Sequence, residues 1–128
     1  MTDKYTYMDP VALLEEVRKL DARINNPITD NFIDGVRHEA AHQVERWGAA
    51  HDRGKTAFDW FWLIGYLAQK AATAAVAYEG AIEHAITPAD RDAAGADLEK
   101  ALHHTISTAA ALLNWHAQLR GQPIADKP

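Results

Sequence analysis

Residues 57–86 read AFDWFWLIGYLAQKAATAAVAYEGAIEHAI, and this stretch decides the fold class. Thr56 stands directly before it as a candidate N-cap. Nine of the thirty residues are alanine, so we expect a helix at the centre of the domain, packed on more than one side. Gly65 and the alanines would allow another helix to approach closely. The apolar stripe recurs at helical spacing and comprises Trp60, Ile64, Leu67, Ala71, Ala74 or Ala75, Tyr78 and Ile82.

Two further helices are predicted before this stretch. Asp9-Pro10 has the residue types of an N-cap followed by a first helical residue, and the segment 11–24 continues with helical spacing. Thr29 or Asp30 caps the second helix, which runs to about Trp47. Its apolar stripe consists of Ile33, Val36, Ala40, Val44 and Trp47.

The C-terminal half contributes the last main helix. A polar loop over residues 51–55 precedes the central helix, and Thr87-Pro88 begins a new element after it. Residues 88–97 are expected to form a short helix or an irregular start, with Gly95 weighing against the helix, and a long helix follows over 98–119. No alternating strand pattern occurs, so the sequence predicts an all-α, single-domain bundle of about four main helices. The stripe expected to face inward is Leu102, Ile106, Ala109 and Leu113.

Length and charge limit the functional classes. The 128 residues predict an N-terminal arm (1–8), one helical domain (9–121) and a C-terminal tail (122–128). A net charge of -5 argues against generic nucleic-acid binding, and the absence of cysteine excludes disulfides and thiolate zinc sites. No segment has the pattern of a signal peptide or membrane span, so we expect a cytoplasmic protein. The wide apolar arcs suggest surface left over for a partner subunit, which predicts a homo-oligomer.

The segment 35–48, GVRHEAAHQVERWG, contains the pattern H-E-x-x-H. In a zinc hydrolase, His38 and His42 would ligate one metal from one helix face, with Glu39 as general base. Helix geometry places the two histidines opposite the predicted apolar stripe, on a polar surface. A third ligand would have to come from a distant residue. A zinc-dependent hydrolase is therefore kept as an alternative.

The same segment contains E-x-x-x-Q-x-x-R-W-G, formed by residues 39–48. It resembles the E-R-x-R-Q-x-x-K-W-G segment of MazG-like proteins of phages and prophages, which are all-α nucleoside triphosphate pyrophosphohydrolases. The order that follows is also similar: a polar loop, a Trp-rich helix (59–65), and a last helix closing on an Ala-rich run and a Trp (109–115). The resemblance covers residues 35–118 and implies a MazG-like fold and a nucleotide or related phosphorylated small molecule as partner.

The chain departs from the family at the metal-binding carboxylates. The family holds magnesium with E-x-x-E on one helix and E-x-x-D on the next, whereas residues 66–70 here read YLAQK. His103, His104 and Ser107 stand near the second motif. Histidine and lysine do not replace a cage of oxygen ligands, so turnover, and the identity of a divalent metal (Mg, Mn or Zn), stay open. If the chain is an enzyme, the resemblance implies a pyrophosphohydrolase-like hydrolase.

A site is expected between the helices that carry residues 39–46, 57–86 and 98–119. Glu39 is the candidate catalytic residue, with Gln43 and Arg46 as polar contacts. Lys70 and His104 would contact phosphate. Trp62 or Tyr66 would stack on a base, because both leave the main apolar stripe. The alternative to a small-molecule site is a non-enzymatic module that binds another protein through its helix faces.

Overall fold

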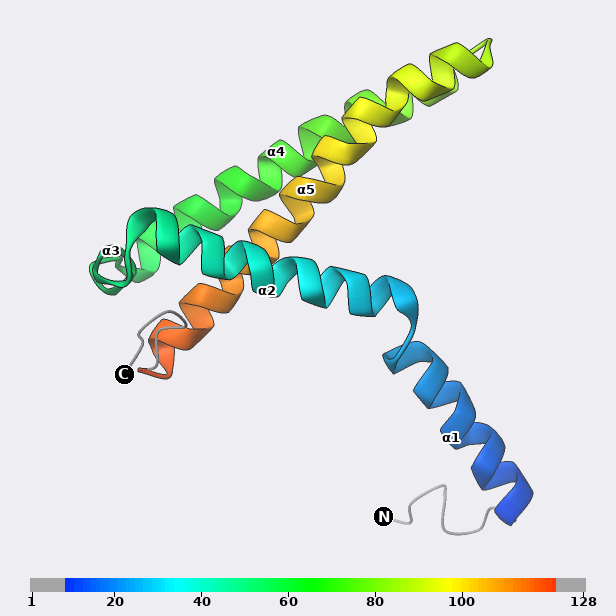
Figure 1. Ribbon diagram of the computed structural model, residues 1–128, viewed down its shortest axis with the longest axis horizontal. Coiled ribbons are helices and arrows are strands. Elements are labelled where there is room, and N and C mark those ends of the chain that lie inside the picture. The colour runs from blue at the N-terminus through cyan, green and yellow to red at the C-terminus, as the bar shows by residue number, and fades with distance from the viewer. Residues whose placement is uncertain (1–8, 122–128) are drawn as a thin grey trace. The chain divides into compact units, whose positions relative to one another are not determined.

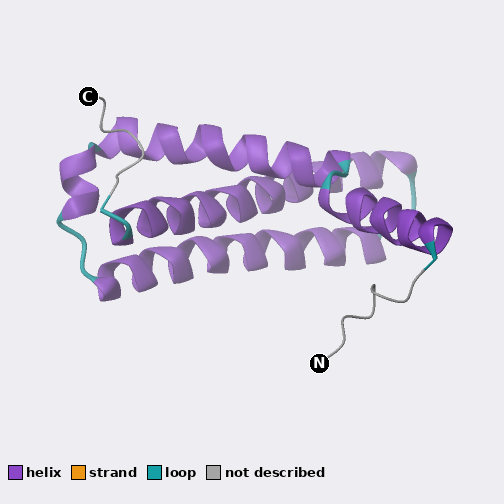
Figure 2. Cartoon of the chain, turned by 90° about the horizontal axis from the view of Figure 1, so that it is seen from below, coloured by secondary structure: helices purple, strands orange, loops and turns teal. Residues whose placement is uncertain are grey.

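The computed structural model describes residues 9–121, apart from the side chain of Ala49. These residues form helices and short connections, and no strand occurs in that range (Figure 2). The all-α class and the four main helices are therefore confirmed. No helix among the described residues is long and apolar enough to cross a bilayer. The predicted arm (1–8) and tail (122–128) lie outside the described residues.

The helices follow one another with short connections, and two of them differ from the prediction. Residues 51–55, expected to form a polar loop, lie mostly in a one-turn helix. The last helix is continuous from Pro88, because Thr87 caps it firmly and one interior glycine costs only about 1 kcal/mol. The elements are α1 (Pro10–Ile24), α2 (Pro27–Trp47), α3 (Ala49–Arg53), α4 (Ala57–Glu83) and α5 (Pro88–Leu119) (Figure 1).

Short polar side chains begin the four long helices. Asp9 accepts a hydrogen bond from the backbone nitrogen of Ala12, as its place before Pro10 predicts. Before α2 the acceptor is Asn26, whose side-chain oxygen lies 2.8 Å from the Thr29 nitrogen. The prediction of Thr29 or Asp30 as cap was wrong by one turn, because Pro27 is accepted at the first helical position. Capping boxes begin the last two long helices, formed by Thr56 with Asp59 and by Thr87 with Asp90.

The chain divides into two compact units, Met1–Asp34 and Gly35–Pro128. In the first unit, α1 has no buried residue, although its sequence is amphipathic. The second unit contains the buried side chains that define a core. The candidate site lies entirely within this second unit.

The core of the second unit is built from α4 and α5, which run antiparallel and side by side (Figure 1). On α4 the predicted inward stripe is confirmed at Trp60 and Ala74, which are buried. On α5 the predicted stripe was wrong at Leu102, which is 50% exposed, whereas Ile106, Ala109 and Leu113 are half-buried. Most of the buried side chains of α5 are small instead, because helices that pack through alanines come too close for leucine. The buried residues of α5 are Ala94, Ala101, Ser107, Ala110, Ala111, Asn114 and Ala117.

Candidate functional site

A cavity of about 250 Å³ lies among α2, α4 and α5. Several side chains of α2 line it, and Glu39, Gln43 and Arg46 lie on one helix face because positions three and four apart are neighbours. Lys70 of α4 and His104 of α5 also line the cavity, so five of the predicted site residues meet there. The remaining lining residues are Trp47, Asp52, Lys55, Trp60, Leu63, Leu67, His103 and Ser107.

Amide side chains hold α2 against α5 beside this cavity. Gln43 donates from Nε2 to the backbone oxygen of Ser107 over 3.1 Å. Asn114 is buried and donates from Nδ2 to the Ala40 backbone oxygen and to Gln43 Oε1, both at 3.2 Å. Gln43 therefore uses both ends of its amide to position α2, and its predicted role as a ligand contact competes with this structural role.

A second network closes the cavity where α3 meets α5. Trp60 donates from Nε1 to Oε1 of Gln118 over 2.7 Å, and Gln118 donates from Nε2 to the Asp52 backbone oxygen over 2.6 Å. Lys55 forms an ion pair with the Asp52 carboxylate and lies 4.5 Å above the Trp60 ring. The positions of Lys55 and Asp52 are thus fixed, and their charges largely cancel.

The charges that remain around the cavity favour an anion. Arg46 lies over the Trp47 ring at 4.9 Å, and Lys70 lies over the Tyr66 ring at 4.7 Å. Within residues 9–121, neither cation forms an ion pair with a carboxylate. Glu39 is half-buried and makes no hydrogen bond or ion pair with another described residue. Once Lys55 and Asp52 are counted as a pair, two cations and two histidines face a single carboxylate.

His104 is the most unusual polar group of the site. Its Nδ1 atom is buried and has no hydrogen-bond partner among the described residues. Desolvation lowers the pKa of His104, and the neighbouring charges of His103, Lys70 and Lys100 lower it further. The ring is therefore neutral at neutral pH, and its Nδ1 lacks the partner that a buried nitrogen normally has.

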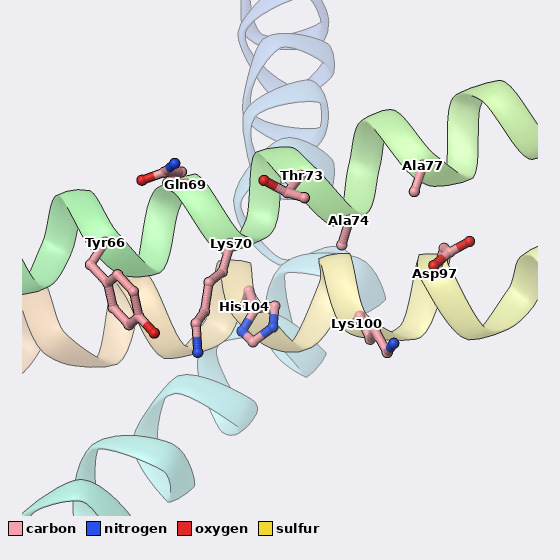
Figure 3. Close-up of a pocket in the computed structure, with 9 residues that line it drawn as sticks. All are labelled: Tyr66, Gln69, Lys70, Thr73, Ala74, Ala77, Asp97, Lys100 and His104. Carbon is pink, nitrogen blue, oxygen red and sulfur yellow. The ribbon is translucent and has the colours of Figure 1, made fainter.

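Lys70 and His104 also border a second cavity of about 430 Å³ between α4 and α5. Figure 3 shows the two side chains next to each other, Lys70 from α4 and His104 from α5. Tyr66 lies on one side of this pair and Lys100 on the other (Figure 3). The pair therefore stands at the boundary of both cavities.

The two predicted aromatic residues do not line the central cavity. Trp62 and Tyr66 stack on each other, with ring centroids 5.4 Å apart and planes 6° from parallel. Tyr66 borders the cavity of Figure 3. Trp62 borders a third cavity of about 760 Å³, which Trp47 also lines. Trp62 is 69% exposed and Trp47 58%, against 43% for Tyr66, so the two tryptophans offer the more accessible aromatic surfaces.

The geometry gives no support to a metal site. His38 and His42 are exposed, as their position opposite the apolar stripe predicts, and neither lines the central cavity. No group of three His, Asp or Glu side chains suited to a metal occurs within residues 9–121. Magnesium requires several oxygen ligands. Of the two carboxylates that line the central cavity, Asp52 is paired with Lys55, so only Glu39 is left to bind a metal there. The described donor set does not fit a resident metal ion.

Asn114 and Gln118 were given no role from the sequence, yet they organise the site. A signal was present: Ser107, Asn114 and Gln118 are spaced by seven and four residues on a helix otherwise rich in alanine. Such spacing places polar groups on one face. A row of polar side chains on an otherwise alanine-rich helix predicts that these side chains are buried and form hydrogen bonds with a neighbouring helix.

Comparisons with protein-family models, with curated proteins and with solved structures find no match to this chain. The chemistry of the site therefore has to be inferred from its own residues. These residues form a small, cation-rich cavity with one uncompensated carboxylate and one unpartnered imidazole nitrogen.

Proposed function

We propose that this chain binds a nucleotide or a related phosphorylated small molecule in the cavity among α2, α4 and α5. The observation that supports it is the convergence of Arg46, Lys70 and His104, from three helices, on one cavity. Cations that are not neutralised by protein carboxylates favour a ligand that carries negative charge. His104 lines the same cavity, so its imidazole adds a polar group beside the two cations.

The volumes of the cavities favour a ligand whose phosphate groups lie in the central cavity and whose remaining part lies in the adjoining cavity. A volume of about 250 Å³ is below the range of about 300–1,000 Å³ that is typical of pockets for whole small molecules. The adjoining cavity with Trp47 and Trp62 is larger and mainly apolar, and it shares Trp47, Lys55 and Leu63 with the central one. A base would stack on Trp47 or Trp62 while its phosphates reach Lys70.

The resemblance of residues 39–48 to MazG-like proteins points to the same ligand class. Hydrolysis is a separate question, because the carboxylates that hold magnesium in that family are not matched here. Glu39 is the residue that would orient a water molecule, since its carboxylate is uncompensated and borders the cavity. We therefore propose binding as the primary function and Glu39-dependent hydrolysis as the activity to be assayed.

Binding can be tested by calorimetry with ATP, the other common nucleoside triphosphates, inorganic tripolyphosphate and adenosine. We expect triphosphates to bind, and tripolyphosphate to bind about 5–150-fold more weakly, since base stacking contributes about 1–3 kcal/mol. Lys70→Ala should weaken binding about 10–100-fold through loss of a charged hydrogen bond. Lys19→Ala, in α1, is the matched control and should bind like the unmodified chain.

The outcomes separate the competing functions. If neither tripolyphosphate nor any nucleotide binds, the proposal fails, and a protein-binding module becomes the better hypothesis. If the ligands bind but phosphate release is the same for Glu39→Gln and the unmodified chain, the site binds without Glu39-dependent hydrolysis. Metal analysis of the untagged protein addresses the zinc alternative: stoichiometric zinc that is lost in His38→Ala would favour it over the proposal.

A further inference from the structure

The outer face of α4 is apolar and open to solvent. We use this name for Phe58, Phe61, Trp62, Gly65, Gln69, Ala72 and Val76, which lie on one side of the helix at three- and four-residue spacing. Phe58 is 84% exposed, Phe61 73%, Trp62 69% and Val76 66%. No member of this face carries a charge. The buried residues Trp60 and Ala74 point to the opposite side, toward α5.

A surface of this kind is unusual for a helix whose final environment is water. Single exposed apolar residues are common, but a contiguous uncharged patch generally marks an interface, since charged residues are depleted at interface cores. Gly65 lies at its centre, and a Cβ added there would have no other atom within 4 Å. The close helix approach that Gly65 permits is therefore not used by the described part of this chain.

We propose that α4 of a second copy of this chain packs antiparallel on the outer face. The three aromatic residues leave roughly 350–550 Å² of surface exposed, if such side chains present about 150–250 Å² each. A standard interface buries about 800 Å² on each partner. The aromatic residues alone thus supply about half of that area, and Val76 with the glycine and alanine surface adds to it.

The order of side chains along the face selects the direction of the partner helix. Phe58, Phe61 and Trp62 are bulky and lie at the N-terminal end, whereas Gly65 and Ala72 are small and follow them. A parallel pair would place aromatic on aromatic and alanine on alanine, which leaves a gap at one end. An antiparallel pair places each bulky end against a small one. This complementarity within a single face is what a two-fold symmetric contact requires.

The register of the pair follows if the outer faces of the two copies overlap over their full length, from Phe58 to Val76. Phe58 then lies opposite Val76 of the second copy, and the two-fold axis passes at the level of residue 67. Trp62 lies at the border between the outer face and the cavity that it shares with Trp47. The second copy would therefore cover the rim of that cavity. The pairing itself does not depend on which ligand the site binds.

Sedimentation and light scattering over a range of concentrations test the dimer. We expect the mass of two chains, and we expect Phe61→Lys to raise the dimer dissociation constant roughly 30-fold or more, as truncation of interface hot spots does. Leu112→Lys is the matched control, because Leu112 is also exposed but lies on α5. It should leave the dimer intact. Circular dichroism shows whether each variant retains its helices.

The absence of cysteine allows the register to be tested by cross-linking single-cysteine variants with a short thiol-specific reagent. In the antiparallel pair the two copies of Gln69→Cys lie about 6 Å apart along the helix, and those of Val76→Cys about 27 Å apart. Gln69→Cys should therefore cross-link to itself, and Val76→Cys should not. A mixture of Phe58→Cys and Val76→Cys chains should give the mixed dimer.

Several results would overturn the proposal. A single-chain mass at all concentrations would show that no second copy covers the face. A dimer that withstands Phe61→Lys but dissociates with Leu112→Lys would place the interface on α5. Efficient self-cross-linking of Val76→Cys would show a parallel pair. If Phe61→Lys loses its helices, the cross-linking of Gln69→Cys, which leaves the aromatic residues in place, decides the question.

Discussion

The indole nitrogen of Trp60 donates a hydrogen bond of 2.7 Å to the side-chain oxygen of Gln118, 58 residues later in the chain. Gln118 in turn donates to the backbone of the segment that leads into α4. One glutamine thus joins the start of α4, the end of α5 and the short α3. Its contribution to stability can be measured.

Gln118→Leu should lower the free energy of unfolding by about 1–3 kcal/mol, because it leaves the buried Trp60 nitrogen without an acceptor. Urea denaturation measures the loss. Trp60→Phe removes the same nitrogen and provides the control. If the hydrogen bond is the cause, Trp60→Phe costs less in the Gln118→Leu background than in the unmodified chain. Additive costs would contradict the explanation.

Asn114→Asp should introduce a pH dependence of stability. The Nδ2 atom of Asn114 faces two acceptors, the Ala40 oxygen and Gln43 Oε1, so an aspartic acid there keeps a donor only while it is protonated. Its pKa in the folded chain would rise above the unfolded value of about 3.9. The variant should therefore lose stability, relative to the unmodified chain, as pH rises from 4 toward 8. A constant difference across this range would show that water reaches the position.

Gly35 and Ile106 should be energetically coupled. Gly35→Ala has two opposing effects on stability. It raises helix propensity by up to about 1 kcal/mol, but the added Cβ would lie only 3.0 Å from Cδ1 of Ile106, which is a tight steric contact. Ile106→Val removes the contacting methyl group. Gly35→Ala should therefore be more favourable in the Ile106→Val background, as thermal or urea denaturation of all four chains would show. The same effect in both backgrounds would mean that Ile106 moves aside without cost.

His104 should make the second unit less stable in acid. Because burial lowers the pKa of His104 in the folded chain, the unfolded chain takes up its proton first as pH falls below about 6.5. The stability of the unmodified chain should decrease between pH 7 and pH 5 more than that of His104→Asn. The comparison isolates His104 from the other histidines. Equal pH profiles would contradict the lowered pKa.

Sulfate should reverse this trend if the proposed site binds anions. Sulfate does not titrate between pH 5 and pH 8, so any change in its affinity over this range comes from the protein. An anion next to Lys70 and His104 favours the protonated imidazole, and the stabilisation by sulfate should grow as pH falls. His104→Asn should remove most of this growth. A pH-independent effect of sulfate would place the anion elsewhere.

Local features of the fold could be predicted from the sequence. Asp9, Thr56 and Thr87 act on backbone nitrogens within their own helix turn, so residue type and the following proline or aspartate were sufficient. The inward face of α5 was not predictable in this way. Leu102 is more apolar than Ala101, yet Ala101 is buried, because the distance to α4 admits only small side chains.

The same distinction applies to the candidate site. Glu39, Gln43 and Arg46 share a helix face by spacing alone, which is why the sequence indicated them together. Asn114 acts through a hydrogen bond to a residue more than 70 positions away, which no local pattern specifies. The cavity to which each aromatic residue belongs likewise depends on how the helices pack against one another.

The alanine-lined contact between α4 and α5 has a consequence for how this protein tolerates mutation. Shortening an alanine removes a single methyl group, so substitutions that create large cavities have little to act on at this contact, apart from the stacked pair Trp60 and Trp115. Enlarging Ala74, which is buried on the side of α4 that faces α5, forces the helices apart. A saturation library should therefore show tolerance that falls with side-chain volume at the alanine positions of this contact, so that even apolar residues as large as leucine are disfavoured there.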